Sequence, residues 1–225
     1  GDSHMTKASE WMTASFLSQS KYGKYGNSLY TGVNKEVYQN KSSSFITGSS
    51  NGTPSQDPTK IQCTYNTLTD RGSGTGSCGG GASTTGNIYG IYDMSGGSHE
   101  YQMSNHNKMS GYKKTSSSGI LLNSGFNGVL YEGGSITNGK DFPDSKYYDL
   151  YTTDDATTAC NGPCYGLTEI SGWYIDSADF VSTSHPWLTL GGSSSGNTGS
   201  GMFSMIQGHG GTDINISFRV ALSTT

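Results

Sequence analysis

The four cysteines of this 225-residue chain are Cys63, Cys78, Cys160 and Cys164, and their spacing limits the thiol chemistry they can perform. An even number of cysteines in a chain rich in Ser, Thr and Gly favours disulfides formed in an oxidising compartment. Residues 161–163, Asn-Gly-Pro, favour a turn that folds the second pair back on itself. We therefore expect structural disulfides Cys63–Cys78 and Cys160–Cys164, with the other connectivities left open. A zinc site of four thiolates is the alternative, although the spacing does not repeat a C-x2-C knuckle.

Carboxylates between residues 141 and 149 are candidates for acid–base chemistry. Asp141, Asp144 and Asp149 are interspersed with tyrosines, and two carboxylates held close together can act as general acid and general base. A solvated or ion-binding loop explains the same residues. No G-x-S-x-G or H-E-x-x-H pattern is present. The G-x-G-x-x-G pattern at 74–79 neither follows a clear strand nor opens a helix, which indicates a loop and not a dinucleotide site.

Residues 86–101, GNIYGIYDMSGGSHEY, resemble the signature G-N-x-x-G-x-Y-D-M-x-G-N-x-W-E-W of the formylglycine-generating-enzyme family. Its departures from the signature include Gly97, where the family has Asn, and His99, where the family has Trp. Residues 191–193 and 218–221 are similar to the family's G-G-S and G-F-R-x-A motifs, and residues 10–14 to its early W-x-x-A helix. The resemblance implies a loop-rich α+β fold of the C-type-lectin-like type, which we expect to form a single domain over residues 6–225.

The same resemblance implies a structural calcium ion in the turn at 93–100. Carried over residue by residue, its ligands are the Asp93 side chain, the carbonyl groups of Gly96 and Ser98, and the Glu100 carboxylate. Hard oxygen ligands with two negative charges suit Ca²⁺, and glycines let carbonyl groups turn inward. In the alternative interpretation, Asp93 caps a turn and Glu100 forms an ion pair.

The enzymes of the resembled family need two cysteines near the C-terminus that bind copper and activate oxygen. Aligned from Gly191, those positions fall on Gly196 and Gly201, which have no side chain to ligate a metal. Cys160 and Cys164 precede the motif and do not replace the missing thiols. Relatives active in iron-dependent sulfur chemistry carry a separate helical iron-binding domain, which we do not find here. We therefore expect no enzymatic activity and no copper.

Residues 188–217 resemble, in position and composition, the hypervariable ligand-binding segment of the variable proteins of diversity-generating retroelements. Those proteins share the fold and place the segment just before a terminal G-F-R-like strand. We expect an exposed, largely preformed binding face. A protein ligand is favoured over a glycan, because no EPN-like or QPD-like sugar-binding triplet is present. A solvated Gly/Ser loop is the alternative. The candidate contacts are Trp187, Ser193, Ser194, Ser195, Asn197, Ser200, Gln207, His209, Asp213 and Asn215.

Composition narrows the class of protein. Charged residues make up 13% of the chain and the net charge is -4, so no basic surface is available for nucleic acid. No apolar run is long enough to span a membrane. We expect a secreted or cell-surface, non-catalytic, adhesin-like domain of a bacterial or phage protein. A pilin-like or fibre subunit is the alternative.

The elements that must position these residues are few. The spacing predicts a helix over residues 6–20 with Trp11, Ala14 and Leu17 on one face. Residues 217–222 predict a terminal strand that ties the end of the chain into a sheet. Residues 1–5 are similar to a cloning remnant and are left outside the predicted fold. The apolar residues within the candidate binding segment include Met202, Phe203, Met205 and Ile206. Alternation along a strand predicts that half of these four are core.

Overall fold

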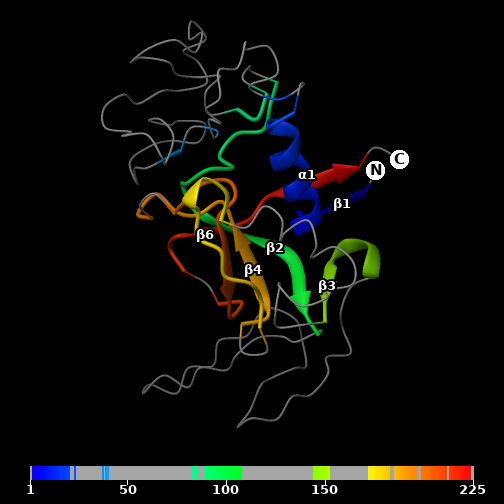
Figure 1. Cartoon of the computed structure of the whole chain (residues 1–225). Helices are drawn as coiled ribbons and strands as arrows, with labels where there is room; N and C mark the ends of the chain where they lie inside the picture. Colours follow the sequence, from blue (N-terminus) through cyan, green and yellow to red (C-terminus); the bar gives the residue numbers. More distant parts are fainter. Residues whose placement is uncertain are drawn as a thin grey trace, which may run out of the picture.

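The structure is a mixed α+β arrangement, as the sequence predicts. It consists mostly of sheet, with one α-helix among the described residues (Figure 1). The computed structural model describes residues 2–20, 23, 37, 39–40, 83–85, 89–107, 144–152, 172–182, 185–196, 199–211 and 213–223. In chain order the elements are β1 (Asp2–Met5), α1 (Ala8–Ser18), β2 (His99–His106), the 3-10 helix η2 (Ser145–Tyr147), β3 (Asp149–Tyr151), the 3-10 helix η3 (Trp173–Ile175), β4 (Trp187–Leu190), β5 (Met205–Gly208), β6 (Ile216–Ser217) and β7 (Val220–Ser223).

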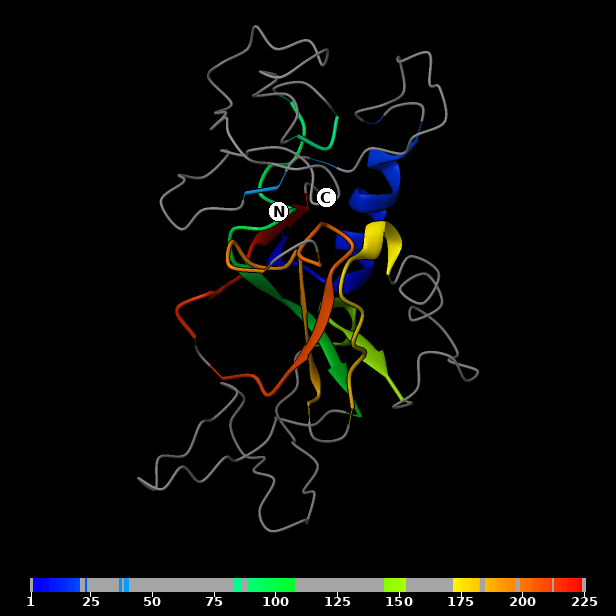
Figure 2. The same ribbon diagram turned by 60° about the vertical axis from the view of Figure 1, so that its left-hand side comes forward.

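Within the described ranges, the main sheet has five strands: four follow the order β3-β2-β4-β5, and β6 pairs with the start of β2. Strand β2 runs parallel to β3 and β6 and antiparallel to β4. Its side chains alternate: Glu100, Gln102 and Ser104 are buried, whereas His99 and Tyr101 on the other face are half-buried. The chain between β5 and β6 runs out from the sheet and returns to the start of β2 (Figure 2). This connection brings the end of the candidate binding segment back to residue 99.

A second, two-stranded sheet joins the two ends of the described chain, because β1 and β7 pair antiparallel from Asp2 opposite Ser223 to Met5 opposite Val220. The prediction that the end of the chain is tied into a sheet is confirmed. Residues 2–5, left out of the predicted fold, are the partner strand. The His4 ring reaches Glu10 at 2.8 Å and lies 5.8 Å from the ring of Tyr147, so these side chains hold the ribbon against the start of α1.

At the start of helix α1, side chains accept the hydrogen bonds of three backbone N–H groups that have no backbone acceptor within the helix. The Lys7 N–H donates to Glu10 (3.0 Å), the Ala8 N–H to the Ser104 hydroxyl (3.0 Å) and the Ser9 N–H to Asp149 (2.7 Å). Two of these acceptors belong to β2 and β3. The helix start is therefore fixed by the sheet beneath it.

The buried face of α1 differs from the predicted one. Trp11 is buried as expected, but Leu17 is 55% exposed, and Ser15 and Ser18 are buried in its place. The two serine hydroxyls donate to helix carbonyl groups, Ser15 to Trp11 (3.0 Å) and Ser18 to Ser15 (2.6 Å), so their burial leaves no donor unsatisfied.

Trp11 lies at the centre of the core beneath α1. Its ring N–H donates to the Met202 carbonyl at 3.0 Å, which links the helix to the candidate binding segment. Met202, Phe203 and Met205 of that segment are buried and Ile206 is half-buried, so more of the apolar residues are core than alternation alone predicts. No helix among the described residues has the length and apolar character needed to cross a membrane.

Candidate functional site

The turn before β2 is the point at which the candidate binding segment is anchored. Asp93, Gly96 and Gly97 adopt left-handed backbone conformations, with φ of 58°, 73° and 76°. The Gly96 N–H donates to the Gly191 carbonyl (2.7 Å) and the Gly97 N–H to the Asn40 carbonyl (2.8 Å). A Cβ atom at Gly96 would lie 2.2 Å from the Asn40 carbonyl oxygen. Glycine is therefore required there for both conformation and space.

Two parts of the candidate binding segment meet this turn through backbone hydrogen bonds. The Ser194 N–H donates to the Gly97 carbonyl (2.8 Å), and the His99 N–H donates to the Asn215 carbonyl (2.9 Å). The side chains beside these two hydrogen bonds are exposed or half-buried, and Ile214 is 94% exposed. We call this set the loop surface; it consists of Ser194, Ser195, Asp213, Ile214 and Asn215.

The loop between β4 and β5 is stabilised by buried residues that we had predicted, from the sequence, to contact the ligand. Ser193 and Ser200 are buried, and the Ser193 N–H donates to the Ser200 hydroxyl (3.2 Å). The Gln39 amide donates to the Ser200 carbonyl (2.7 Å). Trp187 is also buried, in β4. Ser193 and Ser200 therefore support the loop, whereas Trp187 lies at the other end of β4, opposite Gly208. None of the three faces solvent, but Ser194 and Ser195 do.

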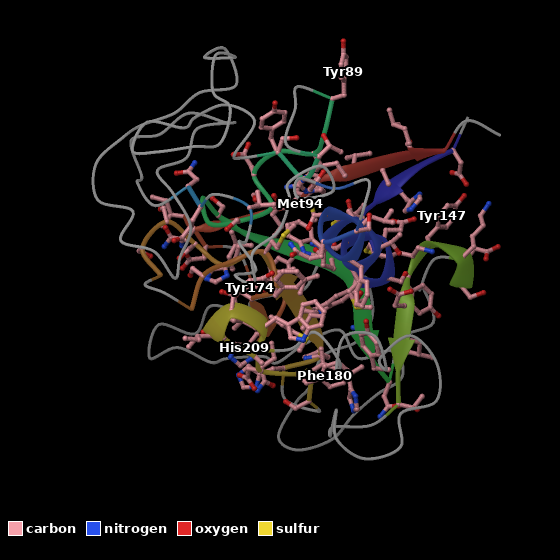
Figure 3. The ribbon with its side chains drawn as sticks, turned by 45° about the horizontal axis from the view of Figure 1, so that its top comes forward. Tyr89, Met94, Tyr147, Tyr174, Phe180 and His209 are labelled. Atoms are coloured by element: carbon pink, nitrogen blue, oxygen red, sulfur yellow. The ribbon has the colours of Figure 1, made fainter. Side chains whose placement is uncertain are left out.

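The remaining predicted contacts lie at the other end of β5. Gln207 donates to Asp179 (2.8 Å) and accepts from Ser182 (2.6 Å), and the His209 ring lies 3.8 Å from that of His185. Figure 3 shows His209 well away from Met94, which lies in the turn before β2. Gln207, which pairs with Leu188, and His209 therefore lie away from the turn before β2. Asn197 lies outside the described residues.

His99 and Tyr101 are neighbours of the loop surface that the sequence analysis did not select. Burial lowers the pKa of His99, partly opposed by Asp213, and burial raises the pKa of Tyr101. The Tyr101 hydroxyl accepts from the Gly210 N–H at 3.0 Å. His99 stands where the resembled signature has Trp, so this departure from the pattern was the available signal.

An ion pair between Glu100 and Arg219 ties the turn, β2 and β7 together. The Arg219 Nε and Nη2 atoms lie 2.5 and 2.6 Å from the two Glu100 oxygens. The same guanidinium donates to the carbonyl groups of Tyr92 (3.2 Å) and Asp93 (3.0 Å) and lies 4.8 Å from the centre of the Trp11 ring. Burial raises the pKa of Glu100, and the hydrogen bonds and charge of Arg219 oppose that rise.

This ion pair bears on the predicted calcium site, whose ligand positions are Asp93, Gly96, Ser98 and Glu100. Both oxygens of Glu100 accept hydrogen bonds from Arg219, so arginine supplies the positive charge that a calcium ion would supply to this carboxylate. Among the residues that the structure describes, no group of three or more His, Cys, Asp or Glu side chains could hold a metal. The predicted site has only two carboxylates, and calcium stays a prediction.

Calcium binding can be checked by melting the protein in excess EDTA and in millimolar Ca²⁺. A calcium ion bound to the folded state must raise the melting temperature, because the unfolded chain lacks the site. Magnesium at the same concentration is the control. Equal melting temperatures in EDTA and Ca²⁺ would contradict calcium binding, and the turn would then be held by the Glu100–Arg219 ion pair without a metal.

Of the three carboxylates considered for acid–base chemistry, the two that the structure describes accept hydrogen bonds from backbone N–H groups. Asp149 accepts from the Ser9 N–H at the start of α1, and Asp144 accepts from the Lys146 N–H (3.1 Å) in η2. Asp141 lies outside the described residues, as do Cys63, Cys78, Cys160 and Cys164, so the disulfide prediction stays a prediction.

Comparison with known proteins leaves the family resemblance as a prediction. No protein-family model, curated protein or solved structure matches this chain at a significant level.

Proposed function

We propose that this chain is a non-catalytic, adhesin-like binding domain with a C-type-lectin-like fold, which acts in a secreted or cell-surface protein and contacts a protein ligand through the loop surface. The observation that carries the proposal is the pair of backbone hydrogen bonds from Ser194 to Gly97 and from His99 to Asn215. They fix two separate parts of one Gly/Ser-rich segment on either side of the same turn.

The chemistry of the loop surface suits recognition of a protein. Its serine, aspartate and asparagine side chains are short hydrogen-bonding groups, and Ile214 adds an apolar contact that is 94% exposed. Serine and asparagine are also enriched in the loops of antibody paratopes, where they supply adaptable hydrogen bonds. Because buried serines and the Gly96 turn hold the backbone, little conformational entropy is lost when a ligand binds.

The buried carboxylates support the non-catalytic part of the proposal. Glu100 is paired with Arg219, and Asp149 accepts from the start of α1. Asp176 accepts from the Phe203 N–H at 3.0 Å. Each of these acids thus has a structural partner, which is the common use of a buried carboxylate.

The proposal is tested by comparing two triple variants of the same chemistry. The first changes the loop surface with Ser195→Arg, Ile214→Ser and Asn215→Arg. The second, a matched control, changes exposed residues elsewhere with Leu17→Ser, Ser145→Arg and Thr152→Arg. We expect both variants to melt within a few degrees of the wild type, because exposed side chains contribute little to stability.

The readout is flow cytometry of a panel of cell types stained with the labelled domain. Staining by the loop-surface variant should fall at least about tenfold, since removing anchors from an interface costs more than about 1.4 kcal/mol. The control variant should stain as the wild type does. Unchanged staining by the loop-surface variant would place the binding site elsewhere, and a wild type that stains no cell in the panel would contradict the adhesin-like function.

A further inference from the structure

The ladder between β4 and β5 ends beside a pair of histidines. Trp187 opposite Gly208 is the last pair of this ladder, and Pro186, the residue before Trp187, has no N–H with which to continue it. Beyond that point the rings of His185 and His209 meet, with their centroids 3.8 Å apart and their planes tilted by 35°. A contact between side chains therefore joins the two chain segments where the backbone hydrogen bonds of the ladder stop.

Both rings are half-buried, and hydrogen bonds place the turn that carries His185. The His185 N–H donates to the Ser182 carbonyl (3.1 Å), and the Ser182 hydroxyl donates to Gln207 in β5 (2.6 Å). Gln207 in turn donates to Asp179 (2.8 Å). These hydrogen bonds hold the turn before β4 against β5, so they bring His185 within reach of His209.

The connection from β5 to β6 starts at His209, in the run Gly208-His209-Gly210-Gly211. Gly210 has a φ of 81°, which glycine adopts readily, and its N–H donates to the Tyr101 hydroxyl (3.0 Å). Figure 2 shows the connection running out from the sheet before it returns to β2. Glycines on both sides of His209 allow the backbone to pivot, so the ring contact fixes where the connection begins and, through it, the loop surface.

Protonation makes this ring contact unfavourable. Two neutral imidazole rings pack together, whereas two imidazolium ions at this distance repel each other. Burial lowers the pKa of His185, the charge of His209 lowers it further, and Asp179 opposes both effects. The form with the rings in contact therefore binds fewer protons than an open form, and a fall in pH below about 6.5, the ordinary histidine pKa, favours the open form.

Other ionisable groups stand on the segments packed against the pair. Asp179 precedes β4, and His106 ends β2, where its N–H donates to the Pro186 carbonyl (2.9 Å). Tyr101, which accepts from Gly210, stays neutral because burial raises its pKa. The one carboxylate among these groups compensates for one imidazolium and not for two, and protonation of His106 would add to the positive charge.

We infer that the contact between His185 and His209 is a pH switch, which holds the start of the β5–β6 connection at neutral pH and releases it below about pH 6. The consequence for ligand binding rests on the proposed function: the loop surface lies on this connection, so it should lose its binding conformation at acidic pH. Such a domain would bind its ligand at a neutral surface and release it in an acidic compartment.

Amide hydrogen exchange followed by NMR tests the switch in the protein without a ligand, at about pH 7.5 and about pH 5, on either side of the ordinary histidine pKa. After correction for intrinsic rates, protection of the Gly210 N–H should fall at least about fivefold at the lower pH, since each proton taken up on opening shifts the equilibrium by up to about tenfold per pH unit. The Gly191 N–H, which donates to Ser204 at the other end of the same two strands, is the internal reference and should change by less than about twofold.

Substitutions by phenylalanine separate the ring contact from the charge. His185→Phe and His209→Phe each keep an aromatic ring and remove one site of protonation, so each should reduce the pH effect on Gly210, and the double variant should abolish it. His4→Phe is the matched control, because His4 lies in β1, and it should respond to pH as the wild type does.

Equal protection of Gly210 at both pH values in the wild type would overturn the inference, as would a pH effect that the double variant retains. Staining of the cell panel at about pH 7.4 and about pH 5.5 tests the consequence: the wild type should stain at least about twofold less at the lower pH, and the double variant equally at both. Equal staining by the wild type would overturn the link to the loop surface. Because amide exchange needs no ligand, a wild type that stains no cell contradicts the proposed function alone.

Discussion

Replacing Arg219 with alanine should lower the free energy of unfolding by about 3–5 kcal/mol, the usual cost of leaving one partner of a buried ion pair without the other. Glu100 would remain buried, with a side chain only 8% exposed, after losing both of its contacts with the guanidinium. The carbonyl groups of Tyr92 and Asp93 would lose a donor, and Trp11 would lose the cation over its ring. Urea denaturation measures the change.

Two further variants identify the source of the effect. Arg219→Lys should recover only part of the stability, because a lysine cannot contact the carboxylate and two carbonyl groups from one planar group. The double variant Arg219→Met with Glu100→Gln should be more stable than Arg219→Ala, since it leaves no buried charge. A loss below about 1 kcal/mol for Arg219→Ala would show that the pair is solvated in the folded protein.

Gly96→Ala should destabilise the protein by about 3 kcal/mol or more, the range reached when strain and overpacking act together. The new methyl group would lie 2.2 Å from the Asn40 carbonyl oxygen, on a backbone whose φ is 73°. Since the Gly96 N–H also donates to Gly191, a shift of this turn should disturb the loop between β4 and β5.

Gly172→Ala is the matched control for this prediction. Gly172 has a φ of 75°, nearly that of Gly96, but a methyl group there would meet no atom within 4 Å. Its cost should therefore be the strain alone, about 1–2 kcal/mol. Urea denaturation of both variants separates the two causes, and equal losses would mean that the Asn40 carbonyl moves aside freely.

The spacing of apolar residues in the sequence was enough to predict helix α1 and strand β7. The spacing of apolar residues around Trp11 located α1, and the apolar run at the end of the chain located β7. The side chains that each element buries were harder to predict. Ser18 is buried with its hydroxyl donating to a helix carbonyl, and Met202, whose sulfur it contacts, lies 184 residues later in the chain. The spacing of apolar residues predicts neither the buried hydroxyl nor the distant residue that covers it.

For the candidate site, too, the sequence predicted the segment but not which of its side chains are buried. A segment of short polar residues with tied ends was predictable from composition, but its division into supporting and exposed side chains was not. Ser193 and Ser194 are adjacent and chemically identical, yet one is buried against Ser200 and the other lies beside Gly97. The orientation of Arg219 likewise depends on Glu100, which is 119 residues away in the sequence. Pairings at that separation leave no trace in local pattern.

The pairing of β1 with β7 has a consequence for the order in which the molecule forms. Thr6, next to β1, donates to the Arg219 carbonyl 213 residues later, and Trp11 donates to Met202 191 residues later. Closing such long loops costs entropy before the contacts repay it, which slows folding. The buried face of helix α1 therefore stays uncovered until residues about 200 positions away have folded against it, and these long-range contacts should set the folding rate.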